Sequence, residues 1–314
     1  MNAISSAPKP VAAGIDLGGT KIEVQLFDSD WIRLDSRRIA TPTSYGALVR
    51  AMVDQITWVD SHLPDLPIGI AAAGLINPAT GLALTANLPA TGKPFPADIA
   101  RAAGRPVSYI NDCRAQALSE SLFGVARGRK SAITLNLGTG LAGGIVLDGQ
   151  LLPGPTGLGG EFGHFALPAP IVAAHSLPIL RCGCGRLGCT ETLIAGPGLS
   201  RIALHLTGQS LAPEAIAARR TRDPGLGKVW SVWCELAAEL IHTLCMTVDP
   251  ECVVLAGGLS RAPLLIEDLT DALQRAQLSG YAAVPLLLAE GGDTTGARGA
   301  AFAAFQGMGA DQHV

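Results

Sequence analysis

The same pattern of hydrophobic and polar positions occurs twice along this chain of 314 residues. Residues 11–17 form an apolar run, Gly18-Gly19-Thr20 interrupts it, and residues 21–27 then alternate between apolar and polar side chains. This alternation predicts a strand, a glycine turn and a second strand. Residues 133–147 repeat the order around Gly138-Thr139-Gly140. Two copies of one unit predict an α/β protein with two related domains that face each other across a cleft.

The rest of the pattern alternates helices with strands. Apolar side chains at helical spacing predict a helix over residues 45–59, and short apolar runs predict strands over residues 68–72 and 252–256. Residues 230–248 and 296–305 predict two further helices. This alternation is typical of α/β proteins.

One strand-to-helix corner carries two polar residues. Residues 107–110 predict a strand that runs into Asn111-Asp112, and residues 115–123 predict the helix that follows. Side chains at such corners lie at the carboxyl ends of strands, where α/β proteins bind their ligands.

We expect two domains from this arrangement. Residues 1–114 form the smaller α/β domain, which the C-terminal helix of residues 296–314 joins. Residues 115–295 form the larger α/β domain, which carries a cysteine-rich loop.

Composition limits the classes of protein that fit the chain. Hydrophobic residues make up 48% and charged residues 16% of the sequence, which is typical of a globular protein. The formal net charge is -3 and no run of Lys or Arg could neutralise a series of phosphates, so nucleic acid is not an expected partner. The sequence shows no secretion signal and no uninterrupted apolar segment of membrane-spanning length. We therefore expect a cytoplasmic protein without a membrane partner.

The two glycine turns are candidate phosphate-binding loops. Glycine has no Cβ, so the turn before Lys21 would let backbone N–H groups approach a phosphate closely. An isolated Gly-Gly is more typical of a plain hairpin turn, but Gly138-Thr139-Gly140 makes a pair, and two opposed turns can clamp a triphosphate. Asp16 ends the first strand, where it either holds water ligands of Mg²⁺ or caps the turn.

Asp112 is the candidate general base. Phosphoryl transfer to an alcohol needs a carboxylate that accepts the proton of the attacking hydroxyl. An Asp directly before a helix is also a common N-cap. The spacing alone leaves both interpretations of Asp112 open.

Three of the seven cysteines gather in one glycine-rich loop. Thiolates at Cys182, Cys184 and Cys189 can occupy three corners of a zinc tetrahedron, and a thiol cluster in a reducing compartment favours metal over disulfides. By spacing alone, the fourth ligand is either His164 or His175. Four protein ligands leave no open position, so we expect a structural zinc ion.

Two glutamates flank this loop. Glu161 lies in the sequence Gly-Glu-Phe-Gly-His, and Glu191 follows the last cysteine of the loop by two positions. Isolated glutamates are usually solvated surface charges. A carboxylate held by a metal-braced loop can instead accept hydrogen bonds from sugar hydroxyls, which is the interpretation that proximity to the cysteines favours.

Together these motifs resemble those of the ROK family of bacterial sugar kinases and repressors. The resemblance covers almost the whole chain, in the order Asp16-Leu17-Gly18-Gly19-Thr20-Lys21, Asn111-Asp112, Gly138-Thr139-Gly140, Gly160-Glu161-Phe162-Gly163-His164 and the run from Cys182 to Glu191. Within the family, the sequence Ala-Asn-Leu-Pro-Ala-Thr-Gly-Lys-Pro at residues 86–94 is similar to that of the N-acetyl-D-glucosamine kinases.

The resemblance implies an actin-like, ribonuclease-H-like fold of two lobes that close over ATP and a hexose, commonly as a homodimer. It implies ATP-dependent phosphorylation of N-acetyl-D-glucosamine at its C6 hydroxyl, with Asp112 as the catalytic base. It also implies His164 as the fourth zinc ligand. The residues implied to line the sugar pocket are Asn87, Asn111, Asp112, Glu161, His164 and Glu191. Those implied to meet ATP and Mg²⁺ are Asp16, Gly18, Gly19, Thr20, Lys21, Gly138, Thr139, Gly140, Gly257 and Gly258.

Other activities of the same family remain open. Glucokinases, fructokinases and N-acetylmannosamine kinases act on sugars that differ at C2 and in ring form, which these motifs do not distinguish. A sugar-sensing repressor would need a DNA-binding module before the first glycine turn, where 17 residues lie. Asp112 argues against a non-catalytic sugar-binding protein. The chain also departs from the family with Cys113-Arg114, where Ala-Asn is frequent, and with a longer insert at residues 165–181.

Overall fold

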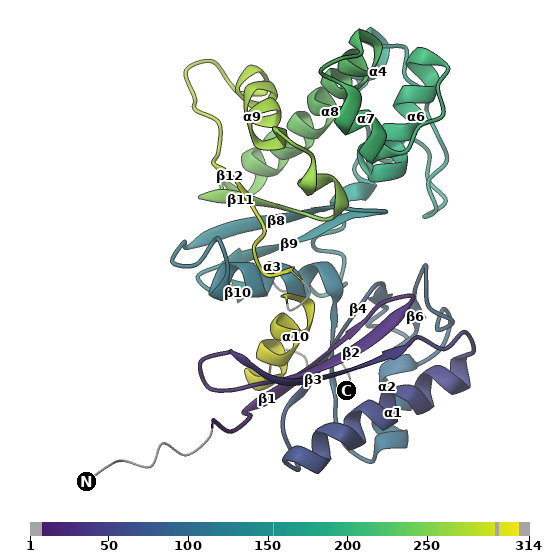
Figure 1. The fold of residues 1–314 in the computed structure, drawn as a ribbon, viewed down its shortest axis with the longest axis vertical. Coiled ribbons are helices and arrows are strands. Elements are labelled where there is room, and N and C mark those ends of the chain that lie inside the picture. The colour runs from purple at the N-terminus through teal and green to yellow at the C-terminus, as the bar shows by residue number, and fades with distance from the viewer. Residues whose placement is uncertain (1–7, 153, 293–294, 308–314) are drawn as a thin grey trace. The chain divides into compact units, whose positions relative to one another are not determined.

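The structure is a computed structural model that describes residues 8–152, 154–292 and 295–307. The end of the predicted helix 296–314, residues 308–314, lies outside the described residues. By packing, the chain divides into two α/β units, drawn in Figure 1. The first unit comprises Met1–Gly124, Leu151–Gly159 and Gly291–Val314, and the second comprises Val125–Gln150 and Gly160–Glu290. The domain limits at residues 114 and 295 stay a prediction.

A five-stranded sheet forms the centre of the first unit. Its strands are β1 (Ala12–Leu17), β2 (Lys21–Phe27), β3 (Arg33–Ala40), β4 (Ile68–Ala72) and β7 (Ser108–Asn111). The spatial order is β3-β2-β1-β4-β7, with antiparallel pairing among the first three strands and parallel pairing from β1 to β7. The first glycine turn connects β1 to β2, as predicted. A separate hairpin contains β5 (Leu75–Ile76) and β6 (Ala83–Leu84).

Among the described residues of the first unit, the helices are α1 (Tyr45–His62), α2 (Phe95–Ala103), α3 (Asp112–Phe123) and α10 (Thr295–Phe305). The predicted helix over residues 45–59 is confirmed by α1. In Figure 1, α10 lies beside β1 and α3. A Cβ at Gly14 of β1 would lie 1.8 Å from the carbonyl oxygen of Ala297, and one at Gly69 of β4 would lie 1.9 Å from that of Ala300. Glycine at both positions therefore lets α10 pack directly on the sheet.

The sheet of the second unit repeats the first. It contains β8 (Ser131–Leu137), β9 (Leu141–Leu147), β10 (Gln150–Leu151), β11 (Cys252–Ala256) and β12 (Leu286–Leu288), in the order β10-β9-β8-β11-β12. Strands β8 and β9 form an antiparallel hairpin, and β11 runs parallel to both β8 and β12. Asp148 and Gly149 have φ of 48° and 74° and form the tight turn into β10. The matching strand order confirms the duplication predicted from the sequence.

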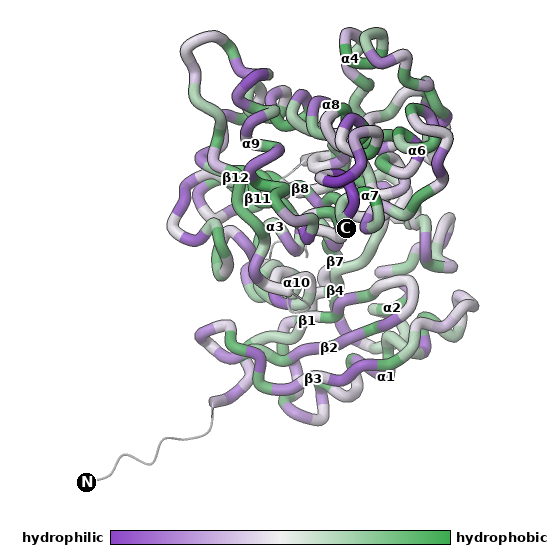
Figure 2. Tube along the Cα trace, turned by 45° about the horizontal axis from the view of Figure 1, so that its top comes forward, coloured by the Kyte–Doolittle hydropathy of each residue, from purple (hydrophilic) through white to green (hydrophobic). Residues whose placement is uncertain are grey.

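Six α-helices of the second unit are α4 (Ala169–Ala174), α5 (Glu191–Ile194), α6 (Gly196–Thr207), α7 (Pro213–Arg219), α8 (Pro224–Val248) and α9 (Leu265–Ala276). Two short 3₁₀ helices are η1 (Phe162–His164) and η2 (Gly258–Arg261). Helix α8 begins six positions before the predicted start at Trp230, because the Asp223 side chain caps it by accepting from the N–H groups of Gly225 and Leu226. Figure 2 shows the apolar character of β11 and β12, which belong to the core of this unit.

Candidate active site

The first glycine turn is held by hydrogen bonds and lies against Asn87. The N–H of Gly18 donates to the carbonyl of Lys21 at 2.9 Å, and Thr41 Oγ1 donates to the carbonyl of Gly18 at 2.7 Å. A Cβ at Gly19 would lie 3.1 Å from the Cβ of Asn87. The structure therefore brings Asn87, predicted to bind sugar, beside the turn predicted to bind phosphate.

Two charged residues next to this turn face other groups of the first unit. A Cβ at Gly296 would lie 3.3 Å from Asp16 Oδ1, so the Asp16 carboxylate faces the first turn of α10. The partial positive charge of a helix N-terminus stabilises a carboxylate there. Lys21 Nζ lies 3.7 Å from an oxygen of the buried Glu23. Mg²⁺ prefers oxygen ligands, which the Asp16 carboxylate offers. The role of Asp16 in binding Mg²⁺ stays a prediction.

The β7–α3 corner is capped by Asn111. Its Oδ1 accepts hydrogen bonds from the N–H groups of Cys113 at 3.0 Å and Arg114 at 3.3 Å, and its Nδ2 donates to the carbonyl of Gly74 at 3.2 Å. Asp112 is the first residue of the helix. The alternative interpretation of Asp112 as the N-cap is therefore wrong. Asn111 is the N-cap, because its side chain accepts from the N–H groups of Cys113 and Arg114.

Asp112 is a half-buried carboxyl group with a perturbed pKa. Burial raises the pKa of Asp112 above its ordinary value, and the N–H of Cys113, which donates to Oδ1 at 2.9 Å, partly opposes that shift. The nearby Tyr109 hydroxyl is also buried, and its pKa is raised by burial and by the charge of Asp112. A carboxylate with a raised pKa is a stronger base than a solvated one, as a proton acceptor requires.

The second glycine turn is braced by α5 and α6. The N–H of Gly138 donates to the carbonyl of Gly140 at 3.1 Å, and the N–H of Gly196 donates to the carbonyl of Gly138 at 2.8 Å. Glu191 Oε2 accepts from the N–H of Leu141 at 3.0 Å, directly after the turn. One oxygen of Glu191, predicted to bind sugar, therefore holds the backbone of the turn predicted to bind phosphate.

Gly257 lies beside the second turn. It has φ of 87°, and a Cβ there would lie 2.4 Å from Asn136 Oδ1 and 2.6 Å from the carbonyl carbon of Leu137. Gly258 begins η2, and Thr139 is exposed at the tip of the turn. The structure thus brings together, at the end of β8, the residues of the second unit that were predicted to meet ATP.

His164 ends η1, and Glu161 directly precedes this short helix. His164 Nε2 is 3.8 Å from Glu161 Oε2. A Cβ at Gly163 would lie 2.2 Å from the carbonyl oxygen of Leu141, and Thr190 Oγ1 donates to the carbonyl of Gly163 at 3.0 Å. The short helix is therefore fixed between β9 and α5, so the orientation of both side chains is restricted.

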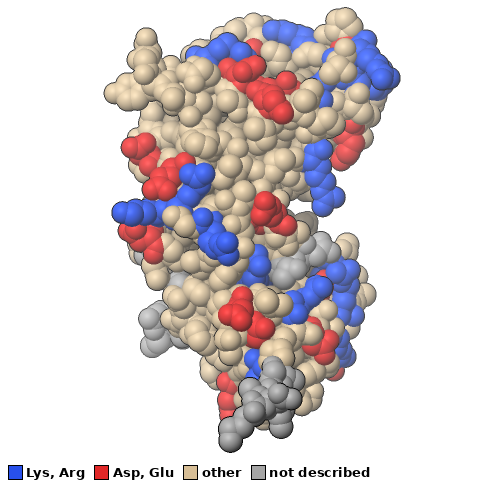
Figure 3. Space-filling model, turned by 60° about the vertical axis from the view of Figure 1, so that its left-hand side comes forward, with Lys and Arg blue, Asp and Glu red and all other residues tan. Residues whose placement is uncertain are grey.

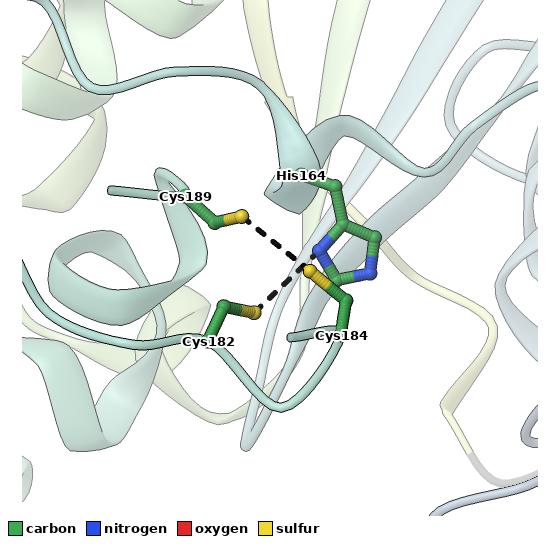
Figure 4. Close-up of side chains that lie close together, drawn as sticks. All are labelled: His164, Cys182, Cys184 and Cys189. Atoms are coloured by element: carbon green, nitrogen blue, oxygen red, sulfur yellow. Dashed lines mark hydrogen bonds between the residues drawn. The ribbon is translucent and has the colours of Figure 1, made fainter. Parts of the chain in front are cut away.

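The three cysteines of the loop converge with His164, as Figure 4 shows. The ligand atoms of these four residues all lie within 4.8 Å of one another. His164 Nδ1 is 3.7 Å from Cys182 Sγ, and the Sγ atoms of Cys184 and Cys189 are 3.6 Å apart. A tetrahedral zinc site with Zn–S bonds of ~2.3 Å has sulfur atoms separated by about 3.8 Å. The donor set and its spacing therefore fit a structural zinc ion.

The alternative fourth ligand, His175, lies elsewhere. Its Nε2 is 2.6 Å from Glu235 Oε2 on α8. The ring of His164 instead has Nδ1 near Cys182 and Nε2 near Glu161. This ring can serve as a metal ligand through one nitrogen while the other interacts with a carboxylate, an arrangement that orients ligating histidines in metal sites.

The thiols of the cluster differ in their environments. Burial raises the pKa of Cys182, and it raises the pKa of Cys189 to about 12. The pKa of the exposed Cys184 is lowered, mainly by the backbone N–H of Arg186. Zinc binds thiolates, so the two buried thiols would release their protons on binding the metal.

The predicted site residues fall into two sets, each within one unit. The first unit holds Asp16, Gly18 to Lys21, Asn87, Asn111 and Asp112, and the second holds Gly138 to Gly140, Glu161, His164, the three cysteines, Glu191, Gly257 and Gly258. The assignment of residues from both sets to one sugar therefore stays a prediction.

Comparison with known proteins decides the family. The sequence pattern of the ROK family matches residues 12–306. The chain belongs to the ROK family. An N-acetylgalactosamine kinase of Shewanella sp. (strain ANA-3) is 36% identical over 292 residues, which are 92% of this chain and 94% of that protein. An N-acetyl-D-glucosamine kinase of Salmonella gallinarum (strain 287/91 / NCTC 13346) is 36% identical over 295 residues, 92% of this chain and 97% of that protein.

Solved ROK structures share the fold. A ROK hexokinase from Thermus thermophilus has a TM-score of 0.83 at 31% identity, with 94% of this chain and 98% of that chain covered. A ROK family glucokinase from Streptomyces griseus, in complex with glucose and AMPPNP, has a TM-score of 0.75 at 26% identity, with 94% and 99% covered. The chain therefore has the actin-like α/β fold of the ROK kinases, and it is an ATP-dependent sugar kinase, as the motifs predicted.

Three contacts at or near the ROK motifs were not predicted. Arg114 donates to carbonyls of the Leu151–Gly159 segment, Glu120 Oε1 accepts from the N–H of Gly291 at 2.8 Å, and Glu191 accepts from that of Leu141. Each joins a side chain to a distant backbone group, and a backbone group has no sequence signature. Only Arg114 had a signal, as a departure from the Ala-Asn that is frequent in the family.

Within residues 8–152, 154–292 and 295–307, none of the helices combines the length and the hydrophobicity needed to cross a bilayer. On the face that Figure 3 shows, Lys and Arg side chains are mixed with Asp and Glu side chains. The homodimer, the cytoplasmic location and the lack of a nucleic acid partner stay predictions.

Proposed function

We propose that this ROK kinase transfers the γ-phosphoryl group of ATP to the C6 hydroxyl of N-acetyl-D-glucosamine. The observation that carries the catalytic part is the half-buried Asp112, which has a raised pKa and begins a helix that Asn111 caps. Relatives at 36% identity that bear the names of N-acetylhexosamine kinases support the acceptor class.

In the proposed reaction, Asp112 accepts the proton of the C6 hydroxyl while that oxygen attacks the γ-phosphorus. The new O–P bond forms as the bond between the γ-phosphorus and the bridging oxygen breaks, which gives ADP and N-acetyl-D-glucosamine 6-phosphate. Backbone N–H groups of the two glycine turns bind and orient the phosphates, and Asp16 is the residue that would hold Mg²⁺. When bound, Mg²⁺ neutralises phosphate charge. The protein contributes mainly positioning and electrostatic stabilisation.

The remaining polar residues bind the sugar in this proposal. Asn87, Glu161 and His164 hydrogen-bond its hydroxyls, and the contact between His164 and Glu161 supports a shared role. Glu191 also contributes to the sugar site in this proposal, with Oε2 accepting from the N–H of Leu141 and Oε1 lying 3.7 Å from Cys182 Sγ. The four-residue cluster holds a structural zinc ion that fixes the loop, and the protein acts as a homodimer.

N-acetyl-D-galactosamine is a second candidate acceptor. The relative from Shewanella is named for that sugar and is as similar to this chain as the N-acetyl-D-glucosamine kinase from Salmonella. The two sugars differ only in the configuration at C4, so one hydrogen bond can discriminate between them.

A panel of acceptors tests the substrate. We expect kcat/KM for N-acetyl-D-glucosamine to exceed that for glucose, fructose and N-acetylmannosamine at least about tenfold. Glucose and fructose lack the acetamido group, and N-acetylmannosamine carries it in the opposite configuration at C2, so each would leave polar groups of the site unpaired. ADP release measured with each sugar, including N-acetyl-D-galactosamine, gives the ranking. The 6-deoxy analogue serves as the control and should release no ADP above background. A preference for glucose or fructose would refute the proposed acceptor and leave the kinase class intact.

The raised pKa of Asp112 predicts the pH dependence of activity. The base must be ionised, so we expect kcat/KM for the sugar to fall as the pH falls through the folded-state pKa of Asp112. Because burial raises that pKa, this decrease should begin at a higher pH than for a solvated aspartate. Rates measured from acidic to neutral pH, with ATP saturating and the sugar below its KM, locate this decrease. A profile that stays flat down to the ordinary pKa of aspartate would contradict the assignment.

A further inference from the structure

Arg114 joins the start of α3 to a segment 45 positions later in the chain. Its Nε donates to the carbonyl of Gly159 at 2.7 Å, and its Nη2 donates to the carbonyl of Gly157. Both carbonyls belong to Leu151–Gly159, the short stretch of the first unit that interrupts the sequence of the second. A guanidinium group has several donors in one rigid plane, so a single Arg side chain can hold two carbonyls, which an ammonium group does less well.

The backbone that leads into Glu161 is held at two successive carbonyls. That of Gly159 accepts from Arg114, and that of Gly160 accepts from the N–H of Gly143 on β9 at 2.8 Å. Gly160 has φ of 93°, a conformation that favours glycine. Glu161 follows directly, so its backbone position depends on both hydrogen bonds.

Arg114 also supports the lining of a cavity in the first unit. This cavity has a volume of about 990 Å³, and it is lined by the β5–β6 hairpin and by three residues of the Leu151–Gly159 segment. Asn111 holds the start of the hairpin through the carbonyl of Gly74 at 3.2 Å, and Arg114 holds the segment. Asp112 lies between these two residues in the sequence. The first turn of α3 therefore fixes both parts of the lining and carries the proposed base.

We propose that Arg114 is a positioning residue for the acceptor sugar, an inference that rests on the proposed function. It holds the Leu151–Gly159 segment so that the following Glu161 presents its carboxylate to the sugar. The segment contains three glycines, so without Arg114 its backbone would sample many more conformations. Sugar binding would then have to order the segment, which weakens binding without altering proton transfer at Asp112. Loss of Arg114 should therefore raise KM for the sugar.

The test compares Arg114→Ala and Arg114→Lys with the wild-type protein. We expect Arg114→Ala to raise KM for the sugar about tenfold, with KM for ATP unchanged and kcat changed less than about twofold. Arg114→Lys should restore part of the affinity, and guanidinium chloride at low concentration should restore part of it in the Ala variant. Hydrogen–deuterium exchange of peptides covering residues 151–160 should accelerate in the Ala variant, and exchange in α1 should not.

Arg101→Ala is the matched control. Arg101 lies in the same unit on α2, its side chain is 75% exposed, and it pairs with Asp98 at the surface. This variant should keep wild-type kinetics and exchange.

Unchanged sugar KM and unchanged exchange in Arg114→Ala would overturn the proposal, as would an equal rise in both KM values with a general increase in exchange. If Arg114→Ala does not fold, the same measurements on Arg114→Lys decide. A wild-type protein that phosphorylates none of the sugars defeats the proposed function, whereas the exchange data still show whether Arg114 holds the segment.

Discussion

Asp112→Asn is expected to lower kcat about a thousandfold while ATP still binds. The amide has the size of the carboxyl group, and its oxygen can still accept from the N–H of Cys113 that donates to Asp112 Oδ1 at 2.9 Å. The amide cannot accept a proton from the sugar hydroxyl at neutral pH. The variant therefore removes the base and leaves the corner capped by Asn111. Steady-state ADP release with saturating sugar measures the loss, and calorimetric titration with ATP measures the retained affinity.

The stability of the variant separates loss of chemistry from loss of structure. Burial raises the folded-state pKa of Asp112, so the folded protein binds that proton more tightly than the unfolded chain does. The contribution of this group to the free energy of unfolding is therefore fully present below its unfolded pKa. It is lost as the pH rises to the folded pKa. A neutral Asn avoids this loss, so Asp112→Asn should unfold at the same temperature as the wild type or higher at neutral pH.

Asp54→Asn is the control for this experiment. Asp54 lies on α1 and forms an exposed ion pair with Arg37 of β3. Exposed ion pairs contribute little to stability. We expect wild-type turnover and melting temperature. Normal turnover in Asp112→Asn would remove Asp112 as the base, and a lower melting temperature with loss of ATP affinity would assign it a structural role instead.

The hairpins and long elements of this fold were predictable because their patterns are strong. Strands β1, β2, β8 and β9 surround two glycine turns, and α1 and α8 carry apolar side chains at helical spacing along most of their length. Strand β3 has no such pattern. It is a polar edge strand with mostly exposed side chains, so no buried face marked it in the sequence. Strands β5 and β6 have two residues each, which is too short for a periodic signal.

The candidate site was predictable where residue type restricts chemistry. Three cysteines with one histidine have few uses besides metal binding, and the structure brings them together. Spacing could not choose between His164 and His175, because the choice depends on how η1 packs against β9. Spacing also could not show that Asn111, and not Asp112, caps α3. That choice depends on the residue at which the helix begins, which a sequence pattern leaves uncertain by one or two positions.

Removal of a cysteine ligand is expected to release zinc and to destabilise the protein. We expect the wild type to contain about one zinc ion per chain and Cys189→Ser to contain none, because a hydroxyl is a poor substitute for a thiolate. The Cys189 side chain is buried, and its sulfur lies 3.6 Å from that of Cys184. Elemental analysis of dialysed protein gives the stoichiometry.

The destabilisation should be large, because the loop from Cys182 to Cys189 has little secondary structure of its own. Its hydrogen bonds are mostly local backbone bonds, such as that from the N–H of Cys182 to the carbonyl of Arg186 at 2.8 Å. Loss of a structural metal should lower the free energy of unfolding by about 3 kcal/mol or more. For a protein of this size that corresponds to a decrease in melting temperature of roughly 6 to 12 °C. Differential scanning calorimetry with and without a chelator measures the change.

Cys245→Ser is the matched control for the zinc prediction. Cys245 lies on α8, is only partly buried and is not a member of the four-residue cluster. This variant should keep its zinc and its melting temperature within about 2 °C, because a small change at a partly exposed position affects stability little. Stoichiometric zinc in Cys189→Ser would show that Cys189 is not a ligand. A wild-type protein that contains no zinc, and whose melting temperature a chelator leaves unchanged, would show that the cluster stabilises the loop without a metal. Since His164 lies on η1 and Glu161 directly precedes it, loss of zinc in Cys189→Ser should also raise KM for the sugar more than KM for ATP.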